Sequence, residues 1–547
     1  MQLRRLAFLA LCLLISLVLV LATAMVLDPN GWSALDVALL ATLALLTPWM
    51  ALASGHGLLG FALLLGSADP PAEVLPATRL ATGMPRGQTS IAICLRNEAM
   101  EEVLPPLARL LDGLPTRGFD LWFLSDTREP ALVASEDAAI AAFRAARPDA
   151  HRIHLRRRAS NAGYKAGNVM EFLDAEGAAY DHMLCLDADS EMTGAAVLRL
   201  VAIMEADARI GIVQQLIVGR PVAAAFPRLF QFGMRAGMRA WATGQAWWQG
   251  DKGPYWGHNA LIRVAAFRAH GRLETLPDGR AILSHDQVEA IRLHQAGWGV
   301  WCFPEEAGSM EGNPPALPEF MARDLRWAAG NMQYLALLRL PGLGAMARWQ
   351  LIQAILLFVG APLWVLAFGL AAAIAVTGGF DSVPASHLAA LMGLFWLAIH
   401  APKLAGYLQV VAQGAQARRH GGRRRFLTGA VLELIFTTLL APISVVNKAR
   451  FLLMLPFGAP MAWSPQNRAD RGVSWGDAAR LLWPHTLAGV LAFAVLAWGA
   501  PWAIWFALPW AGGLLLAVPF CVATTSPGLA AWLVRHRLAA TPEELAV

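Results

Sequence analysis

Apolar and polar positions divide this chain into hydrophobic ends and a central part of mixed character. Hydrophobic residues make up 56% of the chain and charged residues only 15%, whereas soluble domains carry roughly 25% charged residues. About 20 apolar residues can span a bilayer. The pattern predicts six spanning helices: Leu6–Leu27, Val37–Ala68, Trp349–Val376, Leu388–Ala412, Leu481–Gly499 and Trp502–Val522.

The central part has ordinary charge density and alternates apolar runs with amphipathic ones. The expected strands are Thr89–Glu98, Phe119–Thr127, His151–Arg158 and Asp181–Glu191. Helical stretches are expected between them, at Glu101–Leu114, Glu136–Pro148 and Gly167–Ala179. Strands and helices that alternate at this spacing predict an α/β domain with a parallel sheet.

Five regions follow from this division. They are two N-terminal transmembrane helices (1–68), an α/β domain (69–347), a transmembrane hairpin with a basic loop (348–425), an interfacial or re-entrant segment (426–480) and a C-terminal transmembrane hairpin with a short tail (481–547). The α/β domain is therefore inserted between polytopic α-helical transmembrane regions.

Positive charge near the apolar runs predicts the orientation. Arg4 and Arg5 place the N-terminus in the cytoplasm. Two crossings then return the α/β domain to the cytoplasm, and two more deliver the loop Arg418–Arg425 there. Both ends of Phe426–Gly458 are then expected on the cytoplasmic side, which excludes a single crossing. We expect either a hairpin broken near Pro442 or a helix lying in the inner interface.

The cysteines indicate the cellular compartment, and one basic run indicates a class of ligand. The five cysteines are scattered without metal-type spacing, which agrees with a reducing compartment. The run Arg156–Val169 holds four cations and two glycines and could bind an anionic group. Aromatic residues are not interleaved with these cations, so no nucleic-acid partner is expected.

Polar side chains follow the ends of three expected strands. Glu98, Asp126 and the pair Asp187 and Asp189 stand at those ends. In open parallel sheets the ligand binds outside the carboxyl ends of the strands. An Asp-x-Asp triplet alone is a weak signal, and the alternative is a set of solvated loop acids. Convergence on one crevice favours a binding site.

These residues, taken in order, resemble the motifs of family 2 processive glycosyltransferases. Glu98, Asp126, "KAGN" (165–168) and "DAD" (187–189) are followed by "YWGHNALIR" (255–263), "ILSHDQVEA" (282–290) and "RDLRWAAGN" (323–331). Within that family, "WGHN", "SHD" and "GSMEGNPP" (308–315) most resemble the inner-membrane glucosyltransferases of osmoregulated periplasmic glucan synthesis. The resemblance implies a GT-A fold, UDP-glucose as donor and a Mg²⁺ or Mn²⁺ cofactor.

The resemblance also implies the donor site. Asp189 would bind the metal, Asp187 the metal or the ribose, and Asp126 the uracil. Lys165 would contact the diphosphate. Glu98 and Asn168 belong to the same UDP-sugar site, and Arg326 would bind the diphosphate with its two-pronged guanidinium group.

Asp286 is the expected general base. "SHDQ" also reads as a capping box, with Ser284 as N-cap and Gln287 three residues later. A helix N-terminus would lower the pKa of Asp286, so the nearby diphosphate charge would have to raise it again.

The acceptor site is implied by two further motifs. Gly257, His258 and Asn259 would line it, with His258 as a hydrogen-bonding group rather than a metal ligand. Trp327 would stack on the terminal acceptor sugar. Arg323, a further expected acceptor residue, stands where cellulose and hyaluronan synthases have glutamine; this departure puts the acceptor contact at this position in doubt and agrees with the glucan subfamily instead.

A gating loop is a further hypothesis, with Trp463 and Gln466 as its candidate residues in 457–471. The implied protein is a multi-pass enzyme of the bacterial inner membrane that polymerises glucose, in β-1,2 linkage, and passes the glucan to the periplasm. Expected partners are the growing glucan, membrane lipid, an acyl carrier protein and periplasmic glucan-processing proteins. The alternatives are another processive synthase, of the cellulose or hyaluronan type, and a non-catalytic transporter.

Overall fold

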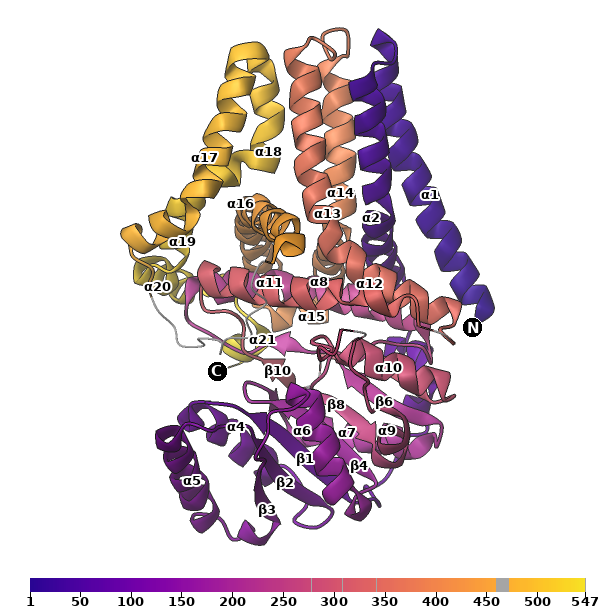
Figure 1. Ribbon diagram of the computed structural model, residues 1–547, viewed down its shortest axis with the longest axis vertical. Helices are drawn as coiled ribbons and strands as arrows, with labels where there is room; N and C mark the ends of the chain where they lie inside the picture. Colours follow the sequence, from indigo (N-terminus) through magenta and orange to yellow (C-terminus); the bar gives the residue numbers. More distant parts are fainter. Residues whose placement is uncertain (277, 307, 341, 459–471, 547) are drawn as a thin grey trace.

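A bundle of long helices stands above an α/β domain, with a layer of nearly horizontal helices between them (Figure 1). This arrangement comes from a computed structural model that describes residues 1–276, 278–306, 308–340, 342–458 and 472–546. Both marked ends of the chain lie on the side of the bundle that faces the α/β domain.

Six of the described helices are long and apolar enough to cross a membrane. They are α1 (Gln2–Leu27), α2 (Ala34–Gly66), α13 (Ala345–Val376), α14 (Ala385–Ala412), α16 (Arg423–Met454) and α17 (Trp475–Gly499). A seventh candidate is the pair α18 (Ile504–Leu515) and α19 (Ala517–Thr524), which is bent by 61°. The protein is therefore a membrane protein, as the apolar runs predict.

Helix α16 differs from the hairpin alternative. It continues through Pro442 without a break, and Figure 1 shows it nearly end-on while α13, α14 and α17 stand upright. Proline in a helix interior removes one backbone hydrogen bond, but membrane helices tolerate it where neighbouring helices pack around the site. Pro442 is buried. An interfacial position for α16 stays a prediction.

The α/β domain is built on a seven-stranded sheet of order β3-β2-β1-β4-β8-β6-β9. Its strands are β1 (Thr89–Leu95), β2 (Phe119–Ser125), β3 (Ile153–Arg157), β4 (His182–Asp187), β6 (Ile210–Gln215), β8 (Ala260–Arg263) and β9 (Gly299–Phe303). The four expected strands are confirmed as parallel neighbours. The sheet as a whole is mixed, because β8 runs antiparallel to β4 and β6.

Helices cover both faces of this sheet, and so its central strands are buried and mostly apolar. Ile91 and Ile93 of β1 pack in one core and Ala92 in another. The covering helices are α3 (Pro70–Val74), α4 (Met100–Asp112), α5 (Pro130–Ala145), α6 (Tyr164–Ala175), α7 (Gly194–Ala206), α9 (Val264–His270) and α10 (Asp286–Gln295). A small sheet adds β5 (Glu191–Met192), β10 (Ser309–Glu311) and β7 (Val218–Gly219).

Helix α8 (Ala225–Gln249) joins the domain to the bundle, together with α11 (Leu317–Met332) and α12 (Tyr334–Leu337). It packs on α2, α14 and α16. Glycines allow close approach: a side chain at Gly60 would overlap the carbonyl oxygen of Ala240, and one at Gly406 that of Ala236.

The C-terminal segment of the chain forms ion pairs with helix α8. The remaining short helices are α15 (Gly414–Arg419), α20 (Pro527–Arg535) and α21 (Pro542–Leu545). From α8, the Arg228 guanidinium contacts the Glu544 carboxylate at 2.7 Å, and Arg235 donates to Glu543 at 2.9 Å. The C-terminal helix α21 is therefore anchored to the layer between bundle and domain.

Candidate active site

The carboxyl ends of β1, β2 and β4 bring the expected polar residues to one edge of the sheet. β4 ends at Asp187, and a turn follows in which the Ser190 amide donates to the Asp187 carbonyl at 3.0 Å. The Asp187 amide in turn donates to the Ser190 hydroxyl at 3.0 Å. This turn carries Asp189 just beyond the strand, at the ligand-binding edge.

Lys165 connects the aspartate pair to the "WGHN" loop. From the first turn of α6, its ammonium group forms an ion pair with Asp187 and donates to the Gly257 carbonyl at 2.8 Å. Burial alone would lower the pKa of Lys165, but the Asp187 carboxylate together with Cys185 and Cys94 raises it overall. A permanent cation therefore stands beside the aspartate pair.

Asp126 is engaged by a residue that the sequence motifs do not single out. Both its carboxylate oxygens accept hydrogen bonds from Arg158, at 2.5 Å from Nε and 3.0 Å from Nη2. Arg158 also donates to Glu171 at 3.0 Å. The uracil contact of Asp126 stays a prediction, and its carboxylate is oriented by Arg158.

The other arginines of the basic run are also paired. Arg156 contacts Glu171, and Arg157 contacts Glu136 and Asp137. The expectation that the whole run binds an anion is therefore corrected, because three of its four cations face carboxylates that hold β3 to the neighbouring helices.

Asn168 holds the fold rather than the edge of the crevice. Its side chain is fully buried, donates to the Leu124 carbonyl at 3.1 Å and accepts from Arg156 at 3.1 Å. Its amide thus joins α6 to β2, and its contact with the donor stays a prediction. Glu98 lies in the loop between β1 and α4, and its predicted role stays a prediction.

Asp286 begins α10 and lies against the "WGHN" loop. A side chain added at Gly257 would come within 3.5 Å of the Asp286 Cβ. Burial raises the pKa of Asp286, although the charge of His285 and the Gln287 amide, which donates to Asp286 at 3.0 Å, lower it. The diphosphate is therefore not needed to raise this pKa.

The predicted capping box is not formed. The N-cap of α10 is His285, one residue later than predicted, and it makes no side-chain cap. Ser284 instead lies against α11, where a side chain at Gly330 would overlap its hydroxyl. His285 pairs with Glu289 at 2.9 Å. Burial alone would lower the pKa of His285, but Glu289 and Asp286 raise it.

The "WGHN" loop turns through two residues of positive φ, Gly257 (87°) and Asn259 (48°). His258 has polar partners at both ring nitrogens, with Ser190 at 3.3 Å and Glu311 at 3.4 Å. Asn259 is fully buried and donates to the Ser309 hydroxyl and the Met310 carbonyl. Its side chain fixes β10, and its acceptor contact stays a prediction.

Helix α11 carries Trp327, the tryptophan of "RDLRW", on the side that faces the expected crevice. The ring of Trp327 is 48% exposed, and the Arg323 guanidinium lies 4.7 Å from its centroid, a cation–π geometry. Arg326 is half-buried one turn along. Asp324 pairs with Lys448 of α16 at 3.1 Å, which ties this helix to the membrane region.

Glu311 belongs to this neighbourhood and was given no role by the sequence motifs. It ends β10, and its pKa is raised by burial while the charges of His258 and Arg323 lower it. Asp189 and Asp187 raise it further. Glu311 is the glutamate of the motif "GSMEGNPP", but a glutamate at the end of a strand can have many roles, so the motif alone does not assign one. Trp463 and Gln466 lie outside the described residues.

The site has the donor atoms that a hard divalent cation requires. Mg²⁺ is commonly held by one or two carboxylates together with substrate phosphates, and Asp187 and Asp189 supply such a pair at the sheet edge. Among the described residues, no group of three or more His, Cys, Asp or Glu side chains is arranged to hold a metal ion. The pair fits a cation that substrate oxygens help to bind.

A mixed sheet with a cation, two edge aspartates and a buried carboxylate at its carboxyl edge defines a glycosyltransferase of the GT-A fold. Residues 90–271 match the model of glycosyl transferase family 2, and residues 182–409 that of glycosyl transferase family group 2. Glucans biosynthesis glucosyltransferase H of Vibrio cholerae is 32% identical over 94% of this chain and 74% of its own length. The chain belongs to glycosyltransferase family 2, among the glucans biosynthesis glucosyltransferases H.

Two further glucosyltransferases H agree with this membership. The glucosyltransferases H of Bradyrhizobium diazoefficiens and Shewanella oneidensis are both 33% identical, over 91% and 94% of this chain and 69% and 73% of their own lengths. Among solved structures, the mannosyltransferase PcManGT from Pyrobaculum calidifontis with GDP-Man and Mn²⁺ is 15% identical at a TM-score of 0.38, over 65% of this chain and 98% of its own.

Proposed function

We propose that the protein polymerises glucose from UDP-glucose into a β-linked glucan, in β-1,2 linkage, with inversion at each transfer. The proposal rests on one observation: Lys165 and Asp286 both lie against Gly257. Lys165 binds the Gly257 carbonyl, and Asp286 packs against the same glycine. A cation for the leaving group and a half-buried base therefore lie on either side of Gly257. The relatives named above are glucosyltransferases of glucan synthesis.

The reaction requires a base and a sink for negative charge. The acceptor hydroxyl oxygen attacks C1 of glucose from the face opposite the diphosphate, and its proton passes to the Asp286 carboxylate. The bond from C1 to the diphosphate oxygen breaks, and UDP leaves with the electron pair. Lys165 and Arg326 stabilise the charge that develops on the diphosphate. Asp187 and Asp189 would hold Mg²⁺ or Mn²⁺, which adds Lewis-acid stabilisation of UDP.

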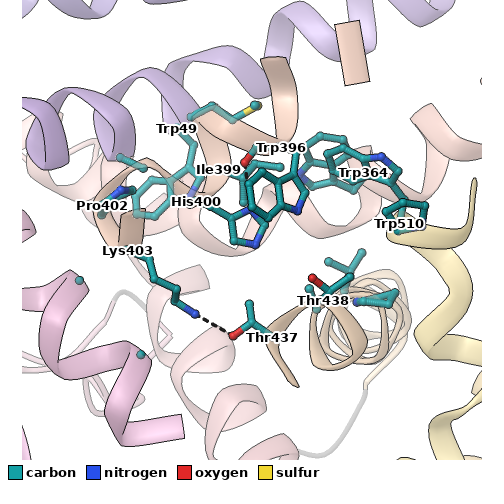
Figure 2. Close-up of a pocket in the computed structure, with 18 of the residues that line it drawn as sticks. Trp49, Trp364, Trp396, Ile399, His400, Pro402, Lys403, Thr437, Thr438 and Trp510 are labelled. Carbon is teal, nitrogen blue, oxygen red and sulfur yellow. Dashed lines mark hydrogen bonds between the residues drawn. The ribbon is translucent and has the colours of Figure 1, made fainter. Parts of the chain in front are cut away.

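A tryptophan-lined cavity within the bundle supports passage of the glucan across the membrane. The cavity of about 370 Å³ lies among α2, α8, α13, α14, α16 and α18, a volume typical of small-ligand sites. Figure 2 shows Trp364, Trp396 and Trp510 along its wall and the Lys403 ammonium donating to Thr437, at 2.7 Å. Flat apolar rings with a few polar groups suit the faces and hydroxyls of sugar units.

The cellular setting completes the proposal. The basic residues at Arg4, Arg5 and Arg418–Arg425 favour the bacterial inner membrane with the α/β domain in the cytoplasm. An acyl carrier protein, membrane lipid and periplasmic glucan-processing proteins remain the expected partners. Membership of family 2 argues against a non-catalytic transporter.

The test is an assay of the purified protein in detergent with Mg²⁺ and radiolabelled UDP-glucose, beside Asp286→Asn. We expect UDP release and β-linked polymer from the wild type, and a loss of about 10²–10⁴-fold in the variant, the usual contribution of a general base. Release with another UDP-sugar but not with UDP-glucose would overturn the donor. Full activity of the variant would overturn the base.

A further inference from the structure

Glu311 stands beside the donor site without a part in the reaction as described so far. It ends β10, whose residue Met310 pairs with Glu191 of β5, directly after the aspartate turn. A side chain added at the next residue, Gly312, would come within 3.5 Å of the Asp189 carboxylate. The end of the strand that carries Glu311 therefore lies beside Asp189, one of the two expected metal ligands.

The strand that carries Glu311 is fixed on both sides. Asn259 donates to the Ser309 hydroxyl at 3.0 Å and to the Met310 carbonyl at 3.2 Å, and the Glu311 carbonyl accepts from the Arg220 amide at 2.9 Å. Its carboxylate lies 3.4 Å from the His258 ring, and 32% of the side chain remains exposed. A ligand can thus reach a carboxylate whose position is set by its neighbours.

Helix α11 forms the opposite side of the space that the Glu311 carboxylate faces. Both segments pack on one turn of α8: Asn313, two residues after Glu311, donates to Gln231 at 3.5 Å, and the Arg323 guanidinium lies 5.7 Å from the ring of the adjacent Phe230. Arg323 stacks on the half-exposed ring of Trp327. Glu311 and Arg323 thus offer an acceptor and a donor of hydrogen bonds beside one aromatic platform.

We propose that Glu311 is an acceptor-binding residue, whose carboxylate accepts a hydrogen bond from a hydroxyl of the terminal glucose stacked on Trp327. Arg323 donates to another oxygen of the same sugar. Fixing two edges of the ring selects which remaining hydroxyl reaches Asp286, so Glu311 determines the linkage of the product. This inference rests on the proposed function.

The test compares Glu311→Gln with Glu191→Gln in the full-length protein. Glu191 lies on the paired strand, but its carboxylate contacts Arg109 of α4 at 2.8 Å, away from the platform, and E191Q controls for the same substitution in the same sheet. The probes are UDP-glucose and short β-1,2-linked gluco-oligosaccharides. We expect E311Q to raise the oligosaccharide KM about tenfold or more, as loss of a charged hydrogen bond predicts, with a much smaller change in the UDP-glucose KM and a mixture of linkages in the product.

A third variant tests whether the two residues hold one sugar. With Arg323→Gln added, the combined effect on the oligosaccharide KM should be smaller than the product of the single effects, because the contacts are shared. Independent, multiplicative effects would overturn the shared sugar.

Binding of UDP, measured by calorimetry, separates the outcomes. E311Q that binds UDP but leaves the oligosaccharide KM and the linkage like those of E191Q overturns the inference. If both E311Q and E311D lose UDP binding, Glu311 acts on the donor side and the inference is wrong. If the wild type binds UDP but does not turn over UDP-glucose, the proposed function fails instead.

Discussion

Burial decides what each carboxylate of the site can do. Burial raises the pKa of the half-buried Asp286, although His285, the Gln287 amide and Lys165 favour its charged form. Asp126 is more deeply buried but has both oxygens on Arg158. The first is suited to take a proton, whereas the second is suited to stay charged and hold its position.

The pH dependence of turnover should report the pKa of Asp286. The base acts in its charged form, so kcat/KM should fall as pH drops through a pKa that lies above the ordinary aspartate range. His285 lowers that pKa, and His285→Asn should therefore move the acid limb to higher pH. The exposed His270→Asn serves as control. An unchanged limb in H285N would contradict the assignment of this limb to Asp286.

Breaking the Arg158–Asp126 pair should destabilise the α/β domain. Removing one partner of a buried ion pair costs about 3–5 kcal/mol, so Arg158→Ala should lower the unfolding midpoint and weaken UDP binding. The exposed pair of Arg209 and Asp207, at 3.3 Å, offers Arg209→Ala as control, with an expected cost of about 0–1 kcal/mol. Equal stability of the two variants would refute the structural role of Arg158.

At the level of elements, apolar patterning was enough to predict β1, β2, β3 and β4 and most membrane helices, but not β6, β8 and β9. Strands β1 and β4 are buried on both faces, so their runs are unbroken, and the helices between strands have regular spacing. Helix α8 escaped notice because Arg228, Arg235 and Arg239 interrupt its aromatic residues. Its burial depends on partners from distant segments, which a local pattern does not contain.

The same reason explains what was predicted of the site. Motif order located Asp187, Asp189 and Asp286 because each follows a strand or begins a helix. It did not reveal that Asn168 and Asn259 are buried, or that Arg158 pairs with Asp126, because those contacts depend on how separate segments pack. The capping box failed because the helix begins one residue later than its motif suggests.

The contact of α2 with α8 should tolerate no side chain at Gly60. A methyl group there would overlap the Ala240 carbonyl, whereas one at Gly66 on the same helix would meet open space. Gly60→Ala should cost about 1–3 kcal/mol through overpacking, and Gly66→Ala should be close to neutral. Detergent-solubilised protein followed by thermal unfolding would measure both, and an unshifted midpoint for G60A would argue against this contact.

For the whole molecule, the cavity and the catalytic edge are expected to serve one path. In sealed vesicles with the α/β domain outside, the wild type should place labelled glucan in the lumen, protected from added glucanase. Trp396→Ala should lower the protected fraction severalfold, because Trp396 lines the cavity. Trp498→Ala, 84% exposed on α17, should not. Equal protection in both variants would remove the cavity from the path.

The position of α8 has a consequence for how the enzyme is made. The ribosome completes α8 after α2 but before α14, α16 and the C-terminal helix α21, and all four of these contact it. The catalytic domain therefore waits for its final supports until the last part of the chain has emerged and inserted. The junction between the α/β domain and the bundle is thus complete only after α14, α16 and α21 have all been made.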